Sequence, residues 1–146
     1  MGQQQLLLLV LGAVIVGLAI MVGINLFGQG AIKANEDAVR QDLLNMAARI
    51  EEFYRKPVML GGGGKDLTLL TSFGQLGYYA DDGTLLTTLA DYANENGTYT
   101  VQGVAAGGCT IQGTMAEGNP ANILTCTIAI DTNGKFTITQ GSGVST

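Results

Sequence analysis

The chain has 146 residues, the usual span of a single domain. Its hydrophobic fraction of 47% is ordinary, but only 13% of its residues are charged, where about a quarter is typical of globular proteins. A net charge of −5 argues against a nucleic-acid partner, and the absence of histidine removes the commonest general base and metal ligand. The composition therefore predicts a protein that is not an enzyme and holds no cofactor or metal.

The N-terminal segment carries no charged side chain before Lys33. Leu6–Ile24 is an unbroken apolar run of 19 residues, which Leu26 and Phe27 extend. A helix of about 20 apolar residues crosses the hydrocarbon core of a bilayer. A secretory signal peptide has a basic front and a shorter apolar core, whereas Met-Gly-Gln-Gln-Gln precedes this run. We therefore predict a retained transmembrane helix over residues 1–31, rather than a removed signal peptide.

Residues 32–56 contain no proline or glycine and predict an amphipathic helix. Apolar side chains recur at spacings of three and four, which places them on one helix face: Val39, Leu43, Met46 or Ala47, Ile50 and Tyr54. Pro57 is expected to end the helix, because proline pushes the preceding residue out of the helical region. We expect the stripe to pack against the remainder of the chain.

Glycines punctuate the N-terminal half of the chain. Gly12, Gly17 and Gly23 have two interpretations. They allow another helix to approach closely or this helix to unwind locally, or they are present only because glycine is frequent in membrane helices. If residues 1–31 and 32–56 form one long helical rod, Gly28-Gln29-Gly30 is the expected break in it. Residues 57–66 include Gly61–Gly64 and predict a flexible joint between rod and head.

Residues 67–146 are predicted to form a β-rich head. Their first part, to Asn96, is ambiguous between helix and strand. The remainder contains four runs rich in threonine and β-branched residues, separated by turn residues: Tyr99–Val104, Cys109–Met115, Ile123–Ile130 and Lys135–Thr139. The predicted fold class is α+β, a long N-terminal helix packed on a C-terminal antiparallel sheet of about four strands.

The register of the last hairpin follows from its apolar pattern. A two-residue turn at Asn133-Gly134 would place Ile130 opposite Thr137 and mix the two faces. A three-residue loop instead pairs Ile130 with Phe136 and Ile128 with Ile138, with Gly134 in the left-handed region. We predict the three-residue loop.

Two further features bear on the head. Cys109 and Cys126 fall in the second and third predicted strands, and are either two buried thiols or a disulfide. A head beyond a membrane span lies in an oxidising compartment, which favours the disulfide. Asn96-Gly97-Thr98 fits the N-glycosylation sequon, and its alternative interpretation is a turn.

An apolar N-terminus leading into a long amphipathic helix, a glycine-rich joint and a terminal antiparallel sheet with a late cysteine pair resemble a bacterial type IV pilin. The resemblance implies processing by a prepilin peptidase, extraction from the inner membrane and helical assembly driven by assembly machinery with a cytoplasmic ATPase. The chain departs from the family pattern in two ways: Gln5 replaces the usual glutamate, and no proline precedes Pro57.

The resemblance also implies which residues form the filament core: Met1, Gln3, Gln4, Gln5, Leu8, Gly12, Gly17, Gly23 and Phe27. In the family, the glutamate is thought to neutralise the N-terminal amine of a neighbour. Gln5 forms no ion pair, but its amide can accept a hydrogen bond from an ammonium group, and a neutral amide costs less to bury than a carboxylate. The three glutamines are expected either to form an inter-subunit hydrogen-bond cluster or to remain a polar tail at the bilayer surface.

We therefore expect a structural subunit that polymerises into an extracellular filament on the cell surface. Its partners are identical subunits, the inner membrane before assembly, and the pilus assembly machinery. Two alternatives remain: a membrane-anchored extracytoplasmic binding domain that never polymerises, and a pseudopilin of a secretion system.

Overall fold

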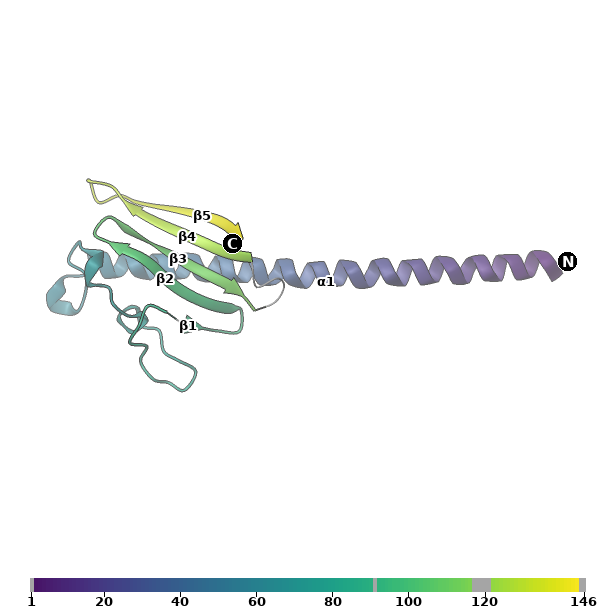
Figure 1. Ribbon diagram of the computed structural model, residues 1–146, viewed down its shortest axis with the longest axis horizontal. Helices are drawn as coiled ribbons and strands as arrows, with labels where there is room; N and C mark the ends of the chain where they lie inside the picture. Colours follow the sequence, from purple (N-terminus) through teal and green to yellow (C-terminus); the bar gives the residue numbers. More distant parts are fainter. Residues whose placement is uncertain (1, 91, 117–121, 145–146) are drawn as a thin grey trace. The chain divides into compact units, whose positions relative to one another are not determined.

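A computed structural model describes residues 2–90, 92–116 and 122–144 of the chain (Figure 1). The chain divides into two compact units, Met1–Ala34 and Asn35–Thr146. The described residues form one α-helix, three 3-10 helices and five strands. In chain order these are α1 (Gly2–Arg55), η1 (Val58–Leu60), η2 (Leu67–Leu69), η3 (Phe73–Leu76), β1 (Tyr92–Ala93), β2 (Gly97–Ala105), β3 (Gly108–Met115), β4 (Asn122–Ile130) and β5 (Phe136–Val144).

Helix α1 is continuous over 54 residues. It ends where expected, at Arg55, just before Pro57 adopts an extended conformation with ψ of 147°. Two ion pairs at i,i+4 spacing, Glu36–Arg40 and Glu51–Arg55, each join nitrogen and oxygen at 2.7 Å. The predicted break at Gly28-Gln29-Gly30 is wrong: each glycine costs only about 1 kcal/mol against alanine, and the apolar residues around them favour the helix.

The segment after α1, where the sequence predicted a flexible joint, is hydrogen-bonded to the end of the helix. Its backbone N–H groups donate to carbonyls at the end of α1 and just after it: Gly63 to Phe53 at 2.7 Å, Lys65 to Tyr54 at 2.8 Å, and Gly64 to Lys56, the residue after the helix, at 2.9 Å. These carbonyls have no partner within the helix itself. A Cβ on Gly62 would lie 2.2 Å from the carbonyl oxygen of Lys56. The glycines therefore allow the chain to close tightly over the helix end.

The segment that was ambiguous in sequence consists of two short 3-10 helices, η2 and η3, and of turns and irregular loops, before it reaches β1. Leu67, Leu70, Phe73 and Leu76 point into the core and are at most 5% exposed. The side chain of Gln75 accepts hydrogen bonds from the backbone N–H groups of Thr71 at 2.8 Å and Ser72 at 3.2 Å, which holds the start of η3. This segment thus covers the core without forming a long helix or strand.

The strands form one antiparallel sheet in the order β1-β2-β3-β4-β5 (Figure 1). The sheet has five strands rather than about four. The additional strand, β1, has only two residues, too few to show a periodic pattern in the sequence. Strand β5 extends to Val144, beyond the predicted end at Thr139, through the glycine- and serine-containing residues 140–143.

The predicted register of the last hairpin is confirmed. Ile130 pairs with Phe136 and Ile128 with Ile138. The carboxylate of Asp131 accepts hydrogen bonds from the backbone N–H groups of Asn133 and Lys135 at 2.8 and 2.9 Å. Gly134 has φ of 76°, the left-handed conformation that the three-residue loop requires.

The core of the second unit lies between one face of the sheet and the part of α1 that begins at Asn35. Alternate residues of β2, β3 and β4 are buried on that face, including Tyr99, Val101, Cys109, Ile111, Met115, Leu124, Cys126 and Ile128. Residues at the alternating positions form the opposite face, which is uncharged and consists mainly of threonine: Thr98, Thr100, Gln102, Thr110, Gln112, Thr114, Thr125, Thr127, Ala129, Thr137 and Thr139.

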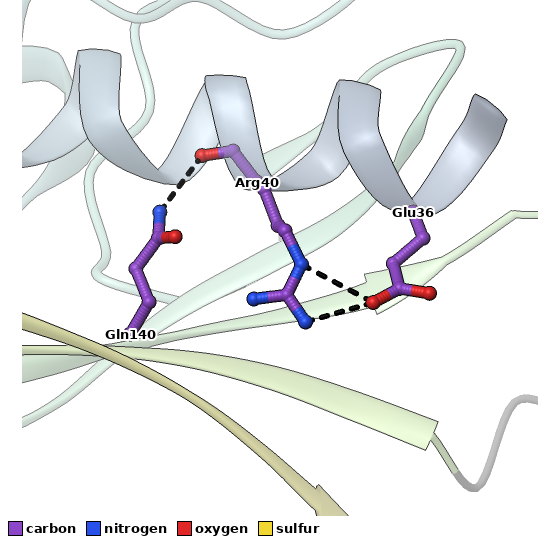
Figure 2. A network of polar contacts seen from close by, with 3 residues as sticks. All are labelled: Glu36, Arg40 and Gln140. Atoms are coloured by element: carbon purple, nitrogen blue, oxygen red, sulfur yellow. Dashed lines mark hydrogen bonds and ion pairs between the residues drawn. The ribbon is translucent and has the colours of Figure 1, made fainter. Parts of the chain in front are cut away.

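Strand β5 is also tied to α1 through a side chain. The amide nitrogen of Gln140 donates to the backbone carbonyl of Arg40 at 3.3 Å, beside the Glu36–Arg40 ion pair (Figure 2). At the start of the strand, the rings of Phe136 and Tyr54 meet edge to face, with centroids 5.1 Å apart. These two contacts hold β5 against the helix within the second unit.

Candidate assembly surface

The apolar half of α1 exposes nearly all of its side chains. From Leu6 to Phe27, the large apolar side chains are between 52% (Leu11) and 83% (Phe27) exposed. They surround the helix on all sides, and such a helix is normally found in a membrane or in the core of a larger assembly. It is long and apolar enough to cross a membrane, and among the described residues it is the one helix that is. The part of the chain that the structure describes leaves this surface uncovered.

Among the described residues, none packs against the glycines of this segment. Cβ atoms added at Gly12, Gly17 and Gly23 would meet no atom within 4 Å beyond the helix's own local backbone. The helix remains wound through all three positions, without the local unwinding considered from the sequence. The fold of the single chain therefore gives no reason for glycine at these sites.

The remaining residues expected in the filament core lie along the same helix. Gln3, Gln4 and Gln5 are exposed in its first turn, and Leu8 is 69% exposed. Met1 lies outside the described residues. Within the described residues, the side chains of this set are spread along the exposed helix and do not meet in one site.

The residues expected to hold the head on the helix lie in the core of the second unit. Val39, Leu43, Met46 and Ile50 are at most 1% exposed, and Tyr54 packs at the margin of the core. Both Ala47 and Phe53 are also buried. Phe53 lies three residues after Ile50 and seven after Met46, so the same spacing could have identified it.

A polar cluster that the sequence analysis missed fastens the head to α1. One carboxylate oxygen of Asp42, Oδ2, accepts hydrogen bonds from the Tyr99 hydroxyl at 2.7 Å, from Asn96 Nδ2 at 2.8 Å and from Asn94 Nδ2 at 2.9 Å. Burial alone would raise the pKa of the Asp42 carboxyl, but the three hydrogen bonds outweigh it and hold that pKa below its usual value. The sequence holds one indication of this cluster. Asp42 lies three residues after Val39, so its carboxylate is beside the buried stripe of the helix.

The side-chain amide of Asn96, the predicted glycosylation site, belongs to the same cluster. Asn96 Nδ2, the atom to which a glycan would be attached, points at Asp42, and the backbone carbonyl of Asn96 accepts from Asn35 Nδ2 at 3.0 Å. Asn94 Oδ1 in turn accepts from the backbone N–H groups of Asn96 and Gly97. The arrangement is that of a turn anchored on the helix.

The predicted disulfide between Cys109 and Cys126 is wrong, because both are free thiols. In the β3–β4 register, Cys109 lies opposite Ile128, and Cys126 lies opposite Ile111. The two cysteines are therefore diagonal neighbours, and diagonal pairs are about 7–8 Å apart, beyond the usual span of a disulfide. Burial, with a smaller contribution from Cys126, raises the pKa of Cys109 to about 12, and burial also raises the pKa of Cys126.

No family model, curated protein or solved structure matches the chain. The architecture, a long apolar N-terminal helix followed by a C-terminal antiparallel sheet, is compatible with a pilin-like fold.

Proposed function

We propose that the chain is a structural subunit that polymerises through its apolar N-terminal helix into an extracellular, type IV pilus-like filament. The observation that carries the proposal is the exposure of every large apolar side chain from Leu6 to Phe27 in a chain whose second unit has a core of its own. Before assembly, lipid covers this surface in the inner membrane. In the filament, the same surface packs against identical helices.

The glycines favour a filament over a simple membrane anchor. A helix that is only dissolved in lipid needs no small residues at particular positions, whereas helices that pack on one another are enriched in them because small residues let backbones approach closely. Gly12, Gly17 and Gly23 serve this role in the proposal. Gln5 then lies in a desolvated core, where a neutral amide is cheaper to bury than a carboxylate.

The test separates packing between copies from insertion into lipid. Gly17→Leu adds a side chain where the single chain has open space, and it raises both apolarity and helix propensity. It should therefore leave the membrane pool intact while surface fibres, sheared from cells and viewed by electron microscopy, fall to background. The matched control is Ile15→Leu, which conserves volume on the same exposed helix and should leave fibres unchanged.

Other outcomes identify the alternatives. If the wild-type chain is recovered only from detergent-solubilised membranes and never as fibres, it is an anchored extracytoplasmic domain. If it forms only short filaments that remain with the cell envelope, it is a pseudopilin. Equal fibre yields from wild type and Gly17→Leu would contradict close packing at Gly17.

A further inference from the structure

Strand β5 forms an edge of the sheet with a long unpaired side. It pairs with β4 over nine residue pairs, from Ile130–Phe136 to Asn122–Val144, and among the described residues no strand pairs with its other side. An edge strand of this kind presents a row of unpaired backbone N–H and C=O groups. Natural proteins commonly protect such edges.

The opposite edge of the sheet is protected in three ways. Strand β1 covers Thr98 and Tyr99, and the N–H of Val101 donates to the carbonyl of Leu89 at 2.8 Å. Beyond these residues, the β2–β3 register is interrupted after Gln102, and Gly103 has φ of 62°. Such irregularities twist an edge away from regular pairing. A second sheet therefore finds no continuous ladder on this side.

Strand β5 has none of these protections. Its sequence, Phe-Thr-Ile-Thr-Gln-Gly-Ser-Gly-Val, contains no charged residue and no proline. The backbone N–H of Asp131 donates to the carbonyl of Lys135 at 3.1 Å, which sets the phase of the β4–β5 ladder. Hydrogen-bonded and non-bonded pairs alternate in an antiparallel ladder. By that alternation, the backbone groups of Phe136, Ile138, Gln140 and Ser142 face the open edge.

We infer that β5 pairs, antiparallel, with β5 of a second copy of this chain. Because the opposite edge is closed, β5 is the long open edge that a second copy offers, so the contact is isologous and stops at two heads. Without charges on either strand, self-pairing places no like charges opposite each other, and the threonines at positions 137 and 139 form the cross-strand pairs that stabilise sheets. Gln140, fixed on the carbonyl of Arg40, keeps the strand in place for this contact (Figure 2).

This pairing is independent of the proposed filament. It uses no residue of the apolar half of α1, and it joins heads two at a time rather than in a row. In a filament-forming protein, it links subunits laterally through their sheets. In a chain that remains in the membrane, it makes a dimer.

The test places like charges on the open edge. Thr137 and Thr139 are both exposed on the uncharged face, so the double variant Thr137→Lys with Thr139→Lys leaves the core untouched. The full chain is purified in detergent micelles, and its protein mass is measured by size-exclusion chromatography with light scattering. The mass of the double-lysine variant should be half that of wild type, because lysines face lysines across the pair. The corresponding double-glutamate variant should show the same loss.

Mixing and a matched control make the result specific. An equimolar mixture of the double-lysine and double-glutamate variants should regain the wild-type mass, since opposite charges then face each other. Thr98→Lys with Gln102→Lys adds the same charge to the same face on β2, which β3 and β4 separate from β5, and should retain the wild-type mass. Any of the following overturns the inference: a wild-type mass of one chain, an unchanged mass in the double-lysine variant, no recovery on mixing, or an equal loss in the control.

Discussion

The hydroxyl of Tyr99, on β2, lies 2.7 Å from Oδ2 of Asp42, on α1, and donates a hydrogen bond to it. The two residues are 57 positions apart in the chain, and Tyr99 is completely buried. Burial, together with this bond, raises the pKa of the Tyr99 hydroxyl, so it remains a donor at any physiological pH. The Asp42 cluster therefore joins the helix to the sheet through a charged acceptor and neutral donors.

We expect Asp42→Ala to destabilise the second unit by roughly 2–4 kcal/mol, because it leaves Tyr99, Asn94 and Asn96 without their acceptor. Asp42→Asn should cost about half as much. All three bonds end on one oxygen, which the amide can replace, but bonds to a neutral acceptor are about half as strong. The measurement is chemical unfolding of the full chain in detergent, followed by circular dichroism. Asp37→Ala, at an exposed position on the same helix, should cause no loss.

The Asp42 cluster should also make the head sensitive to acid. The pKa of Asp42 is lower in the folded state than in the unfolded chain. Its contribution is therefore complete above the unfolded value of about 3.9 and is lost as the pH falls through the lower folded value. Other carboxyl groups titrate in the same range, so the relevant quantity is the stability difference between wild type and Asp42→Asn. That difference should shrink between pH 6 and pH 2, and a constant difference would contradict the assignment.

Gly62 should not tolerate a side chain. A Cβ there would lie 2.2 Å from the carbonyl oxygen of Lys56 and 2.4 Å from its Cβ, so Gly62→Ala must displace the turn that closes the end of α1. We expect a loss of about 1–3 kcal/mol, typical of overpacking, measured by the same unfolding assay. Gly107→Ala is the matched control, because its nearest contact would be at 3.9 Å. Equal stability of the two variants would show that the turn is loose.

The two thiols should be present but unreactive in the folded chain. Cys109 is 4% exposed, Cys126 is 0% exposed, and the pKa of each is raised. Because the thiolate is the reactive form, iodoacetamide should label neither cysteine under native conditions. After denaturation without a reductant, mass spectrometry should find two labelled sites. Labelling that appears only after reduction would indicate a disulfide instead.

Features set by nearby residues could be predicted from the sequence. The helix, its end before Pro57 and the apolar stripe follow from spacing within a few turns. The β4–β5 register follows from Asp131, Gly134 and the alternation of the flanking strands. In each case, the residues that decide the structure are neighbours along the chain.

Features set by distant residues could not be predicted in the same way. The Asp42 cluster depends on how α1 meets β2 and the loop before it. The cysteines were correctly placed on neighbouring strands, but a two-residue offset in the β3–β4 register makes them diagonal. The composition of Gly61–Gly64 predicts a flexible backbone. It gives no sign that the backbone N–H groups of Gly63 and Gly64 find acceptors at the end of α1.

The buried core of the second unit takes its first residue from Val39 and uses none of the side chains before it. In the proposed filament, a subunit built this way would exchange lipid for protein around its leading helix without unpacking its folded portion. The energetic cost of such a transfer then falls on the helix alone. Under the proposed function, extraction of the helix from lipid would therefore leave the globular part intact.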